Sequence, residues 1–127
     1  MTSLCLGVAF AVVQARVPVD EFTLAWTHSV EKTEWEEDYR VEQSGLQLLE
    51  ARIQGSGAGM EPPEGAELRN GRWHYRPQLP PRPSLTLTRS GYTSDYRLCW
   101  QDSCHPLTEL LGSPAVPGET VDLFPCD

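Results

Sequence analysis

The chain has 127 residues, which is enough to enclose one hydrophobic core but too few for two independent ones. Its hydrophobic content of 39%, with four tryptophans, is typical of a globular protein rather than a disordered one. Ten basic and 18 acidic residues give a formal net charge of −8, which argues against nucleic acids and anionic membrane surfaces as partners. We expect a single domain that spans residues 1–127.

Short apolar alternations, eleven prolines and ten glycines dominate the sequence, and long stretches of helical periodicity are missing. This pattern predicts an all-β fold, either an antiparallel β-sandwich or a partly open β-barrel, of about eight to nine strands. At most one short helix is expected, the turn LTELLG at 107–112, which ends on Gly112. The expected strands, in chain order, are 3–13, 22–30, 35–42, 46–54, 66–69, 72–76, 84–89, 95–100 and 120–124.

The first expected strand overlaps an apolar run at residues 4–13. This run is much shorter than the about 20 residues of a membrane-spanning helix. It also lacks a preceding basic segment and a convincing cleavage site of small residues, so we do not identify it as a signal peptide. On this interpretation the chain is either cytoplasmic or starts with a mature domain whose export signal is absent.

Residues 22–42 carry two apolar alternations of opposite phase. In FTLAWTHSV the apolar residues have even numbers, whereas in WEEDYRV they have odd numbers. Side chains alternate strictly along a strand, so one continuous strand would need a bulge to change phase. We predict instead a β-hairpin with its tip at Lys32–Thr33. The alternative is a helix capped by Thr33 and Glu36, but acids at helical spacing would repel one another in it.

In this hairpin His28 is expected to face Glu37, and Trp26 to face Tyr39, all on the inward side of the sheet. An imidazole would then lie opposite a carboxylate among aromatic side chains. Burial favours the neutral forms of both groups, whereas their mutual attraction favours the charged forms. Two interpretations stay open: a metal-dependent or carboxylate-based enzyme that uses His28 and Glu37, or a satisfied structural pair.

Other patterns that suggest catalysis do not hold. His28 and Ser29 are neighbours on a strand and point to opposite faces, so they cannot act as base and nucleophile. The GSGAGM segment lacks glycines two residues on either side of Ser56, so it is not a nucleophile elbow. It also lacks the Lys-Ser or Lys-Thr that completes a phosphate-binding loop. We therefore predict a protein that is not an enzyme and needs no cofactor.

The segment QGSGAGMEPPEG places Gly55, Gly57, Gly59 and Gly65 around two prolines. One interpretation is a structured Ω-type loop, in which the glycines supply positive φ angles and close packing. The other is a nest of exposed amide N–H groups that holds a carboxylate or another small anion, together with Lys32 or an arginine.

Asn70-Gly71 is typical of a β-hairpin, because both residues tolerate the positive φ angles of a type I′ turn. This turn would place Leu68 opposite Trp73 and Ala66 opposite Tyr75. The following run PQLPPRP, at 77–83, cannot donate regular ladder hydrogen bonds. We interpret it as an extended connection between strands rather than as a ligand for a proline-binding domain.

The four cysteines can pair in three ways. Cys99 and Cys104 flank a turn in CWQDSC, which brings cross-strand β-carbons within disulfide range. Cys5 and Cys126 would then join the two ends of the chain. Unligated buried thiols are an alternative, and so is zinc, although the spacing differs from the short C-x2-C pairs of structural zinc sites.

Charge is distributed unevenly along the chain. Residues 20–50 carry nine acids against Lys32 and Arg40, and six of the ten basic residues lie within 69–97. We interpret this pattern as an acidic strand pair that lies near a basic one, and the alternative is a surface that attracts cations. Calcium is a weak candidate, because carboxylates along one strand splay apart rather than converge. The acids in question are Glu34, Glu36 and Asp38.

The stretch FTLAWTHSVEKTEWEEDYRV, followed by GLQLLEARIQGSGAGMEPPEGA, resembles a bacterial family catalogued as a domain of unknown function, numbered eighteen-fifty. The resemblance covers roughly residues 4–77, and LCWQDSC and the terminal FPC resemble one branch of the family. Members are small β-rich proteins, often encoded beside TAXI-type TRAP transporters, which are secondary transporters with a soluble substrate-binding protein. The resemblance implies no enzymatic activity. Its motif residues map onto Thr27, His28, Ser29, Glu31, Lys32, Thr33, Glu36, Gly55, Gly57, Ala58 and Gly59.

These observations lead to one functional hypothesis, a non-enzymatic accessory or binding domain of a TAXI-type TRAP transporter system. The THSVEKT hairpin and the GSGAGM loop would form its recognition surface, with Lys32 and the loop amides meeting an anionic group on the transporter, its substrate-binding protein or a small ligand. The resemblance and the cysteines favour an extracytoplasmic location. The expected site residues are His28, Ser29, Glu31, Lys32, Thr33, Glu36, Glu37, Gly55, Ser56, Gly57 and Gly59.

Overall fold

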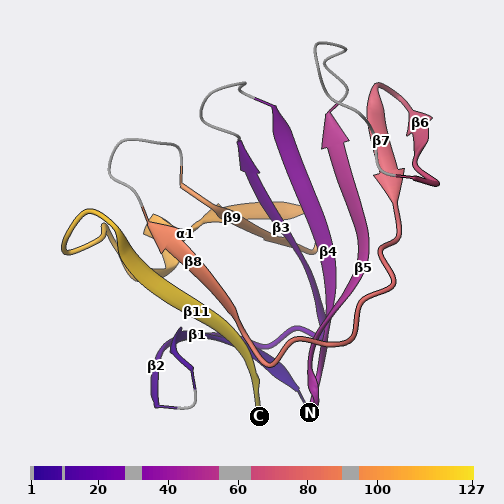
Figure 1. Ribbon diagram of the computed structural model, residues 1–127. Helices are drawn as coiled ribbons and strands as arrows, with labels where there is room; N and C mark the ends of the chain where they lie inside the picture. The colour runs from indigo at the N-terminus through magenta and orange to yellow at the C-terminus, as the bar shows by residue number, and fades with distance from the viewer. Residues whose placement is uncertain (1, 10, 28–32, 55–63, 90–94) are drawn as a thin grey trace.

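The computed structural model shows two antiparallel β-sheets packed against each other, which confirms the all-β prediction in its sandwich form (Figure 1). The structure describes residues 2–9, 11–27, 33–54, 64–89 and 95–127. The sheets lie close together at the end where the chain termini meet and diverge toward the opposite end. Within the described residues no helix is long and apolar enough to cross a membrane.

The smaller sheet has the strand order β2-β1-β11-β8. Its strands are β1 (Ser3–Val8), β2 (Val12–Val17), β11 (Glu119–Cys126) and β8 (Leu85–Arg89). The prediction of a single strand at 3–13 was wrong, because the chain turns after β1 and returns as β2. The Ala11 amide donates a hydrogen bond to the Val8 carbonyl at 3.0 Å in this turn. None of the usual turn residues marks the position, which explains the error.

The larger sheet has the order β10-β9-β3-β4-β5-β7-β6. Its strands are β10 (Ser103–Pro106), β9 (Arg97–Trp100), β3 (Glu21–Thr27), β4 (Glu34–Glu42), β5 (Gly45–Gln54), β7 (Arg72–Tyr75) and β6 (Glu67–Arg69). Strand β10 was not predicted; it follows a tight turn in which Gln101 and Asp102 have φ angles of 52° and 65°. Helix α1 (Leu107–Leu111) ends at Gly112 with φ 78°, as predicted.

The hydrophobic core lies between the two sheets. Alternate residues of the facing strands enter it, as the period of two requires. Helix α1 contributes Leu107, which is completely buried. The buried cluster comprises Leu4, Leu6, Val17, Phe22, Leu24, Tyr39, Val41, Leu46, Leu85, Leu87, Leu98, Leu107, Val121 and Leu123.

A β-bulge in β5 keeps both halves of that strand apolar on the inner side. Tyr39 pairs with Leu48 and the preceding Asp38 pairs with Glu50, so Leu49 is the extra residue. The inserted residue changes the phase of the strand. Residues on either side of it therefore point toward the core, although their numbers differ in parity. Leu46 and Leu48 lie before the bulge, and Ala51 and Ile53 after it.

The Asn70–Gly71 turn has the predicted conformation, with φ angles of 52° and 79°. Leu68 pairs with Trp73 as expected. Ala66 does not pair with Tyr75, because β6 starts only at Glu67. Leu68 is 57% exposed, so this hairpin extends beyond the core rather than adding to it.

We expect Gly71→Ala to lower the free energy of unfolding by about 1 kcal/mol, because a residue with a β-carbon is strained at positive φ. No atom lies within 4 Å of the position that the added carbon would take, so the loss arises from backbone conformation alone. Urea unfolding measures the loss. Asn70→Gly is the control and should leave stability within about 0.5 kcal/mol, since glycine adopts the same φ angle freely. An equal loss in both variants would contradict this explanation.

Residues 77–83 connect β7 with β8 in different sheets, which confirms the predicted connection. Arg82 anchors this segment. Its backbone exchanges two hydrogen bonds with that of Leu46, at 2.7 and 3.0 Å. A β-carbon at the neighbouring Gly45 would lie only 2.4 Å from the Arg82 carbonyl oxygen, so this close contact requires glycine.

Both predicted disulfides are present. Cys5–Cys126 joins β1 to β11, and their Cα atoms are 5.9 Å apart. Cys99–Cys104 joins β9 to β10 at directly opposite positions of the ladder. No free cysteine remains, so the thiol and zinc alternatives are wrong.

Candidate functional site

The β3–β4 hairpin provides most of the predicted site residues, but its register differs from the predicted one. Leu24 pairs with Glu37, and Trp26 pairs with Trp35. The predicted pairing of His28 with Glu37 is therefore wrong. The hypothesis of an enzyme that uses His28 and Glu37 depended on this pairing, so the pairing no longer supports it.

The error comes from the length of the connection. Strand β3 ends at Thr27 and β4 starts at Glu34, so more than two residues separate the strands. Tyr39 consequently pairs with Phe22 and not with Trp26. The observed and predicted registers differ by an even number of residues, so the described side chains of β3 and β4 keep the faces that were predicted for them.

The structure divides the predicted site residues into three groups. Thr33 is buried, with 2% of its surface exposed. Glu36 and Glu37 are neighbours on β4 and point to opposite faces of the larger sheet, so they do not form one site. The others lie outside the described residues: His28, Ser29, Glu31, Lys32, Gly55, Ser56, Gly57 and Gly59.

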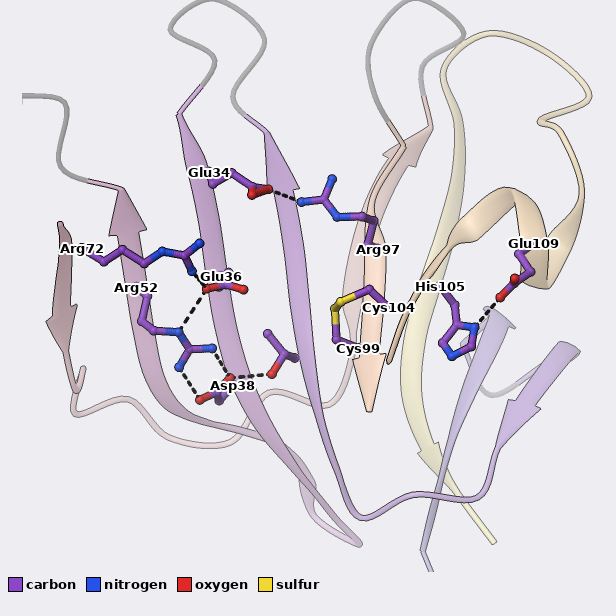
Figure 2. The surroundings of a disulfide bond; sticks show 11 residues. Glu34, Glu36, Asp38, Arg52, Arg72, Arg97, Cys99, Cys104, His105 and Glu109 are labelled. Atoms are coloured by element: carbon purple, nitrogen blue, oxygen red, sulfur yellow. Dashed lines mark hydrogen bonds and ion pairs between the residues drawn. A yellow bond between two sulfur atoms is a disulfide. The ribbon is translucent and has the colours of Figure 1, made fainter. Parts of the chain in front are cut away.

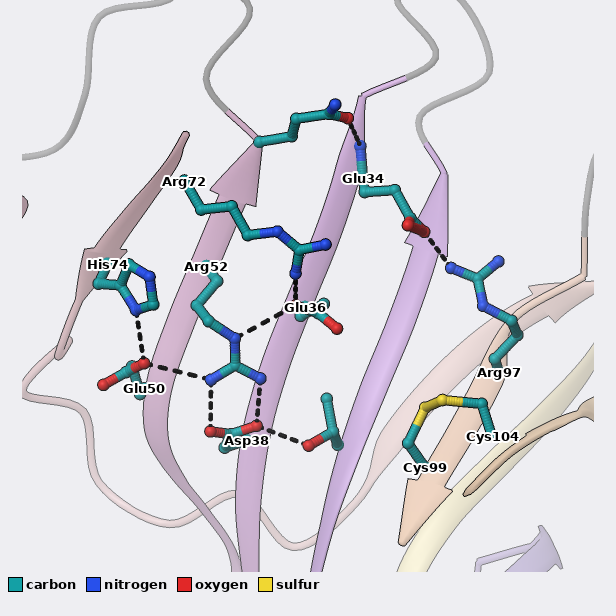
Figure 3. A network of polar contacts seen from close by, with 12 residues as sticks. Glu34, Glu36, Asp38, Glu50, Arg52, Arg72, His74, Arg97, Cys99 and Cys104 are labelled. Carbon is teal, nitrogen blue, oxygen red and sulfur yellow. Dashed lines mark hydrogen bonds and ion pairs between the residues drawn. A yellow bond between two sulfur atoms is a disulfide. The ribbon is translucent and has the colours of Figure 1, made fainter. Parts of the chain in front are cut away.

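Arg52 of β5 is the centre of a charged network on the outer face of the larger sheet (Figure 3). Its guanidinium donates two hydrogen bonds to the Asp38 carboxylate, at 2.6 and 2.7 Å. It donates further bonds to Glu36 and Glu50, each at 3.2 Å. Only 18% of the Arg52 side chain is exposed, so solvent screens these contacts incompletely.

The network lowers the pKa of two of its carboxyl groups. Burial alone would raise the pKa of Asp38, but hydrogen bonds from Arg52 and Thr23 and the charge of Arg52 outweigh burial and lower it. The pKa of Glu50 is also lowered, mainly by its hydrogen bond with His74 and further by Arg52. These bonds also raise the pKa of Arg52, chiefly through Asp38.

Two further arginines bind outward acids of β4. Arg72 of β7 donates to Glu36, and Arg97 of β9 donates to Glu34 (Figure 3). The interpretation of an acidic strand near basic ones is thus confirmed, and the acids proposed for calcium bind arginines instead. Among the described residues, no group of three or more His, Cys, Asp or Glu side chains is arranged to hold a metal ion.

The Cys99–Cys104 disulfide lies beside this network, toward the β10 edge of the sheet (Figure 2). Beyond it, the ring of His105 stacks on Trp100 with a centroid distance of 4.1 Å. His105 also contacts the carboxylate of Glu109 in α1, one helical turn along the chain. These contacts hold α1 and the β9–β10 hairpin together at this edge.

The inner face of the larger sheet carries a cavity of about 300 Å³. It lies between this face, the 77–83 connection and strand β8. Most of its wall is apolar, and the lining residues with a charged or hydroxyl side chain are Glu37, Tyr39, Arg82, Thr86 and Tyr96. The complete lining is Leu24, Trp26, Glu37, Tyr39, Leu46, Leu48, Leu79, Pro80, Arg82, Leu85, Thr86, Leu87 and Tyr96.

Aromatic rings surround the carboxylate side of this cavity. Trp26 stacks on Trp35 with ring centroids 6.0 Å apart, and it contacts Tyr96 in a tilted arrangement at 5.9 Å. The Tyr39 hydroxyl donates a hydrogen bond to Glu37 at 2.8 Å. The Glu37 carboxylate is therefore held in place by the strand that carries it.

The negative charge of Glu37 acts on three tyrosines around it. Burial and then Glu37 raise the pKa of Tyr39, and the same two causes in the same order raise the pKa of Tyr75 and Tyr96. All three hydroxyls are protonated at neutral pH, since their pKa values lie above the ordinary value of 10.0. The Tyr39 proton is used in the hydrogen bond to Glu37, whereas the hydroxyls of Tyr75 and Tyr96 can donate to a ligand.

Glu37 differs from the outward acids of its strand because it has no basic partner among the described residues. Glu34, Glu36 and Asp38 each bind an arginine. Glu37 accepts only the Tyr39 hydrogen bond there. The described residues thus provide no counter-charge for this carboxylate beside a largely apolar cavity.

The sequence identified Glu37 because strand phase placed it inward. It did not identify Arg82, Tyr96 or Leu79 as residues near Glu37. Their position depends on the path of the 77–83 connection and on where β9 pairs, and no local pattern encodes either. The one sequence feature that pointed to this connection was the half-apolar, proline-rich run PQLPPRP. Such a run suits a segment that crosses the edge of the sandwich from one sheet to the other.

Comparisons with known proteins agree with the family resemblance. Neither the curated proteins nor the solved structures contain a significant match to the chain. One family model, described as a domain of unknown function (DUF1850), matches residues 22–107. These residues run from Phe22 in β3 to Leu107, the first residue of α1, and include Glu37, Arg52 and Arg82. The chain therefore belongs to the DUF1850 family.

Proposed function

We propose that this protein is a non-enzymatic, ligand-binding accessory domain of a TAXI-type TRAP transporter system. The observation that carries the proposal is the cavity around Glu37, where a carboxylate with no basic partner among the described residues lies in an apolar and aromatic wall. Concave apolar sites with a few convergent polar groups are the usual form of small-molecule sites, and about 300 Å³ is at the small end of their range. The transporter association rests on the family resemblance.

The two sequence motifs are proposed as the surface that meets the protein partner. Residues 28–32 and 55–63 lie outside the described part of the chain, but the strand ends that carry them are neighbours. Thr27 pairs with Glu34, and the Glu34 amide donates a hydrogen bond to the side chain of Gln54 at 3.2 Å. One partner surface can therefore reach both attachment points.

An extracytoplasmic location is part of the proposal. Both disulfides join strands within the fold, and disulfides persist chiefly in oxidising compartments such as the periplasm. A soluble substrate-binding protein works in the same compartment, so the two would meet there.

Calorimetric titration of the protein with the cognate TAXI substrate-binding protein, and separately with the detergent-solubilised transporter, tests the partner. We expect binding to at least one of them and a loss of at least about tenfold in affinity for Lys32→Ala. Arg69→Ala is the control, because Arg69 is exposed and makes only a 3.7 Å contact with Glu67. Absence of binding to both partners would refute the transporter association.

A thermal-shift screen with small anions, cations, zwitterions and neutral compounds tests the ligand site. A compound that binds only the folded state raises the unfolding temperature, because its stabilisation grows with the logarithm of its concentration relative to Kd. We expect at least one class to do so, and Glu37→Gln to change the response. If no class stabilises the protein, the cavity is not a ligand site.

A further inference from the structure

The charges on the cavity wall indicate which class of ligand it takes. This inference rests on the proposed function, because it presumes that the cavity binds a small molecule. One acidic and one basic residue line the wall, Glu37 and Arg82. Neither has an ion pair among the described residues, and they do not pair with each other within 4.0 Å.

The Glu37 side of the cavity is suited to a positive group. One carboxylate oxygen accepts the Tyr39 hydroxyl, and this leaves lone pairs on the carboxylate for a further donor. The rings of Trp26, Tyr39 and Tyr96 line the same cavity. The faces of aromatic rings attract an ammonium group, so rings and carboxylate favour the same charge.

The Arg82 side of the cavity is suited to a negative group. The backbone of Arg82 is fixed by its two hydrogen bonds to Leu46, and Pro81 and Pro83 stiffen the chain on either side. The guanidinium is near enough to Tyr39 to oppose the rise of its pKa. A planar guanidinium without a carboxylate partner is the group that best recognises a carboxylate by two parallel hydrogen bonds.

A ligand with one charge cannot satisfy both sides. A simple cation would be attracted by Glu37 and repelled by Arg82. A simple anion would be attracted by Arg82 and repelled by Glu37. Much of the remaining wall is aliphatic and includes Leu24, Leu46, Leu48, Leu85 and Leu87. Burial of an apolar body there would contribute about 25 cal/mol for each Å² removed from water.

We propose that the cavity binds a small zwitterion with an aliphatic body, whose ammonium group lies against Glu37 and whose carboxylate lies against Arg82. A medium-sized aliphatic amino acid has this chemistry. The two charges of the ligand then compensate Glu37 and Arg82, which have no ion pair in the described part of the chain, and its side chain contacts the leucines of the wall.

Three probes of similar shape distinguish the contributions of the two ligand charges. Leucine carries both charges, 3-methylbutylamine lacks the carboxylate, and 4-methylpentanoate lacks the ammonium group. Isothermal titration of the whole protein at pH 7 compares them. We expect leucine to bind at least about tenfold more tightly than either singly charged probe. Equal or tighter binding of the amine or of the acid would overturn the zwitterion assignment.

Two variants assign each charge to its residue. Glu37→Gln should weaken leucine and the amine but not the acid, whereas Arg82→Gln should weaken leucine and the acid but strengthen the amine. Arg76→Gln is the control, since the Arg76 side chain is 78% exposed and lies outside this cavity. If both variants bind all three probes as the wild type does, the charges of Glu37 and Arg82 do not recognise the ligand. Thermal unfolding verifies that each variant is folded.

The test separates this inference from the proposed function. If none of the three probes binds but another class of compound stabilises the protein through Glu37, the zwitterion assignment fails and the ligand-binding domain stands. If no compound of any class binds, both fail.

Discussion

Replacement of Cys5 and Cys126 by alanine is expected to lower the free energy of unfolding by about 5 kcal/mol, more than any other change considered. The disulfide joins residues 121 positions apart, so it constrains nearly the whole unfolded chain. In the chain-entropy description, the stabilisation grows with the logarithm of the closed loop and reaches about 4.7 kcal/mol for a loop of 100 residues. Guanidinium unfolding of the oxidised wild type and of the double variant measures the difference.

The second disulfide provides a matched control. Cys99 and Cys104 are only five positions apart, so the same description gives about 2 kcal/mol for their replacement by alanine. We also expect the slope of unfolding against denaturant to increase only in the Cys5/Cys126 variant, because its unfolded state becomes less compact. Equal losses in the two double variants would show that loop closure does not govern their stability.

Arg52→Met is expected to lower the free energy of unfolding by about 2 kcal/mol at pH 7. Methionine keeps most of the length of the side chain but leaves the carboxylates of Asp38, Glu36 and Glu50 without their shared partner. Removal of one partner from a fully buried ion pair costs about 3–5 kcal/mol. We reduce that figure because these carboxylates are partly accessible to water. Urea unfolding measures the loss.

The effect of Arg52→Met should depend on pH. The pKa values of Asp38 and Glu50 are lower in the folded protein than their ordinary values of 3.8 and 4.5. Groups of this kind stabilise the fold fully above their ordinary pKa, and the contribution is lost as pH falls through the folded value. The difference between wild type and variant should therefore be constant near neutrality and shrink below about pH 4. A difference that persists unchanged to pH 2 would contradict an electrostatic origin.

Arg40→Met is the control for Arg52→Met. Arg40 lies on the neighbouring strand, but 53% of its side chain is exposed and its contact with Glu42 spans 3.8 Å. Exposed pairs of this kind contribute at most about 1 kcal/mol. A loss as large as that of Arg52→Met would indicate that the position of the arginine in the network is unimportant.

Strand phase was predictable here and strand register was not. The alternation of FTLAWTHSV and WEEDYRV assigns each side chain to a face, and the structure agrees for Glu36, Glu37 and Asp38. Register depends on where the strands end, and the assumed tip at Lys32–Thr33 was too tight. Because the shift is an even number of residues, the error changed partners and not faces.

Turns without glycine, proline or asparagine limited the prediction elsewhere. The apolar run at 4–13 hides the turn between β1 and β2, and the short β10 contains residues with little β propensity, Ser103 to Pro106. Each omission removed one strand from the expected total, which explains why eleven strands are present in the described residues rather than eight to nine. The Asn70-Gly71 turn, with its characteristic residues, was predicted correctly.

Only the part of the cavity wall around Glu37 could be predicted from the sequence. Glu37 was expected to point inward among Trp26 and Tyr39, which follows from the period of two. Arg82 comes from a segment with no periodicity, and its place in the cavity wall depends on its backbone contact with Leu46, a contact between residues far apart in the sequence. Such long-range pairings have no local signature in one sequence.

The location of the chain ends has a consequence for attachment. Ser3 pairs with Cys126, so the two ends leave the sandwich side by side (Figure 1). The strand ends Thr27, Glu34 and Gln54 lie at the opposite end of the molecule. A tag, a lipid anchor or a fused domain at either terminus would hold the protein by the end remote from these strand ends. Immobilisation through a terminus therefore leaves that end free to meet a partner.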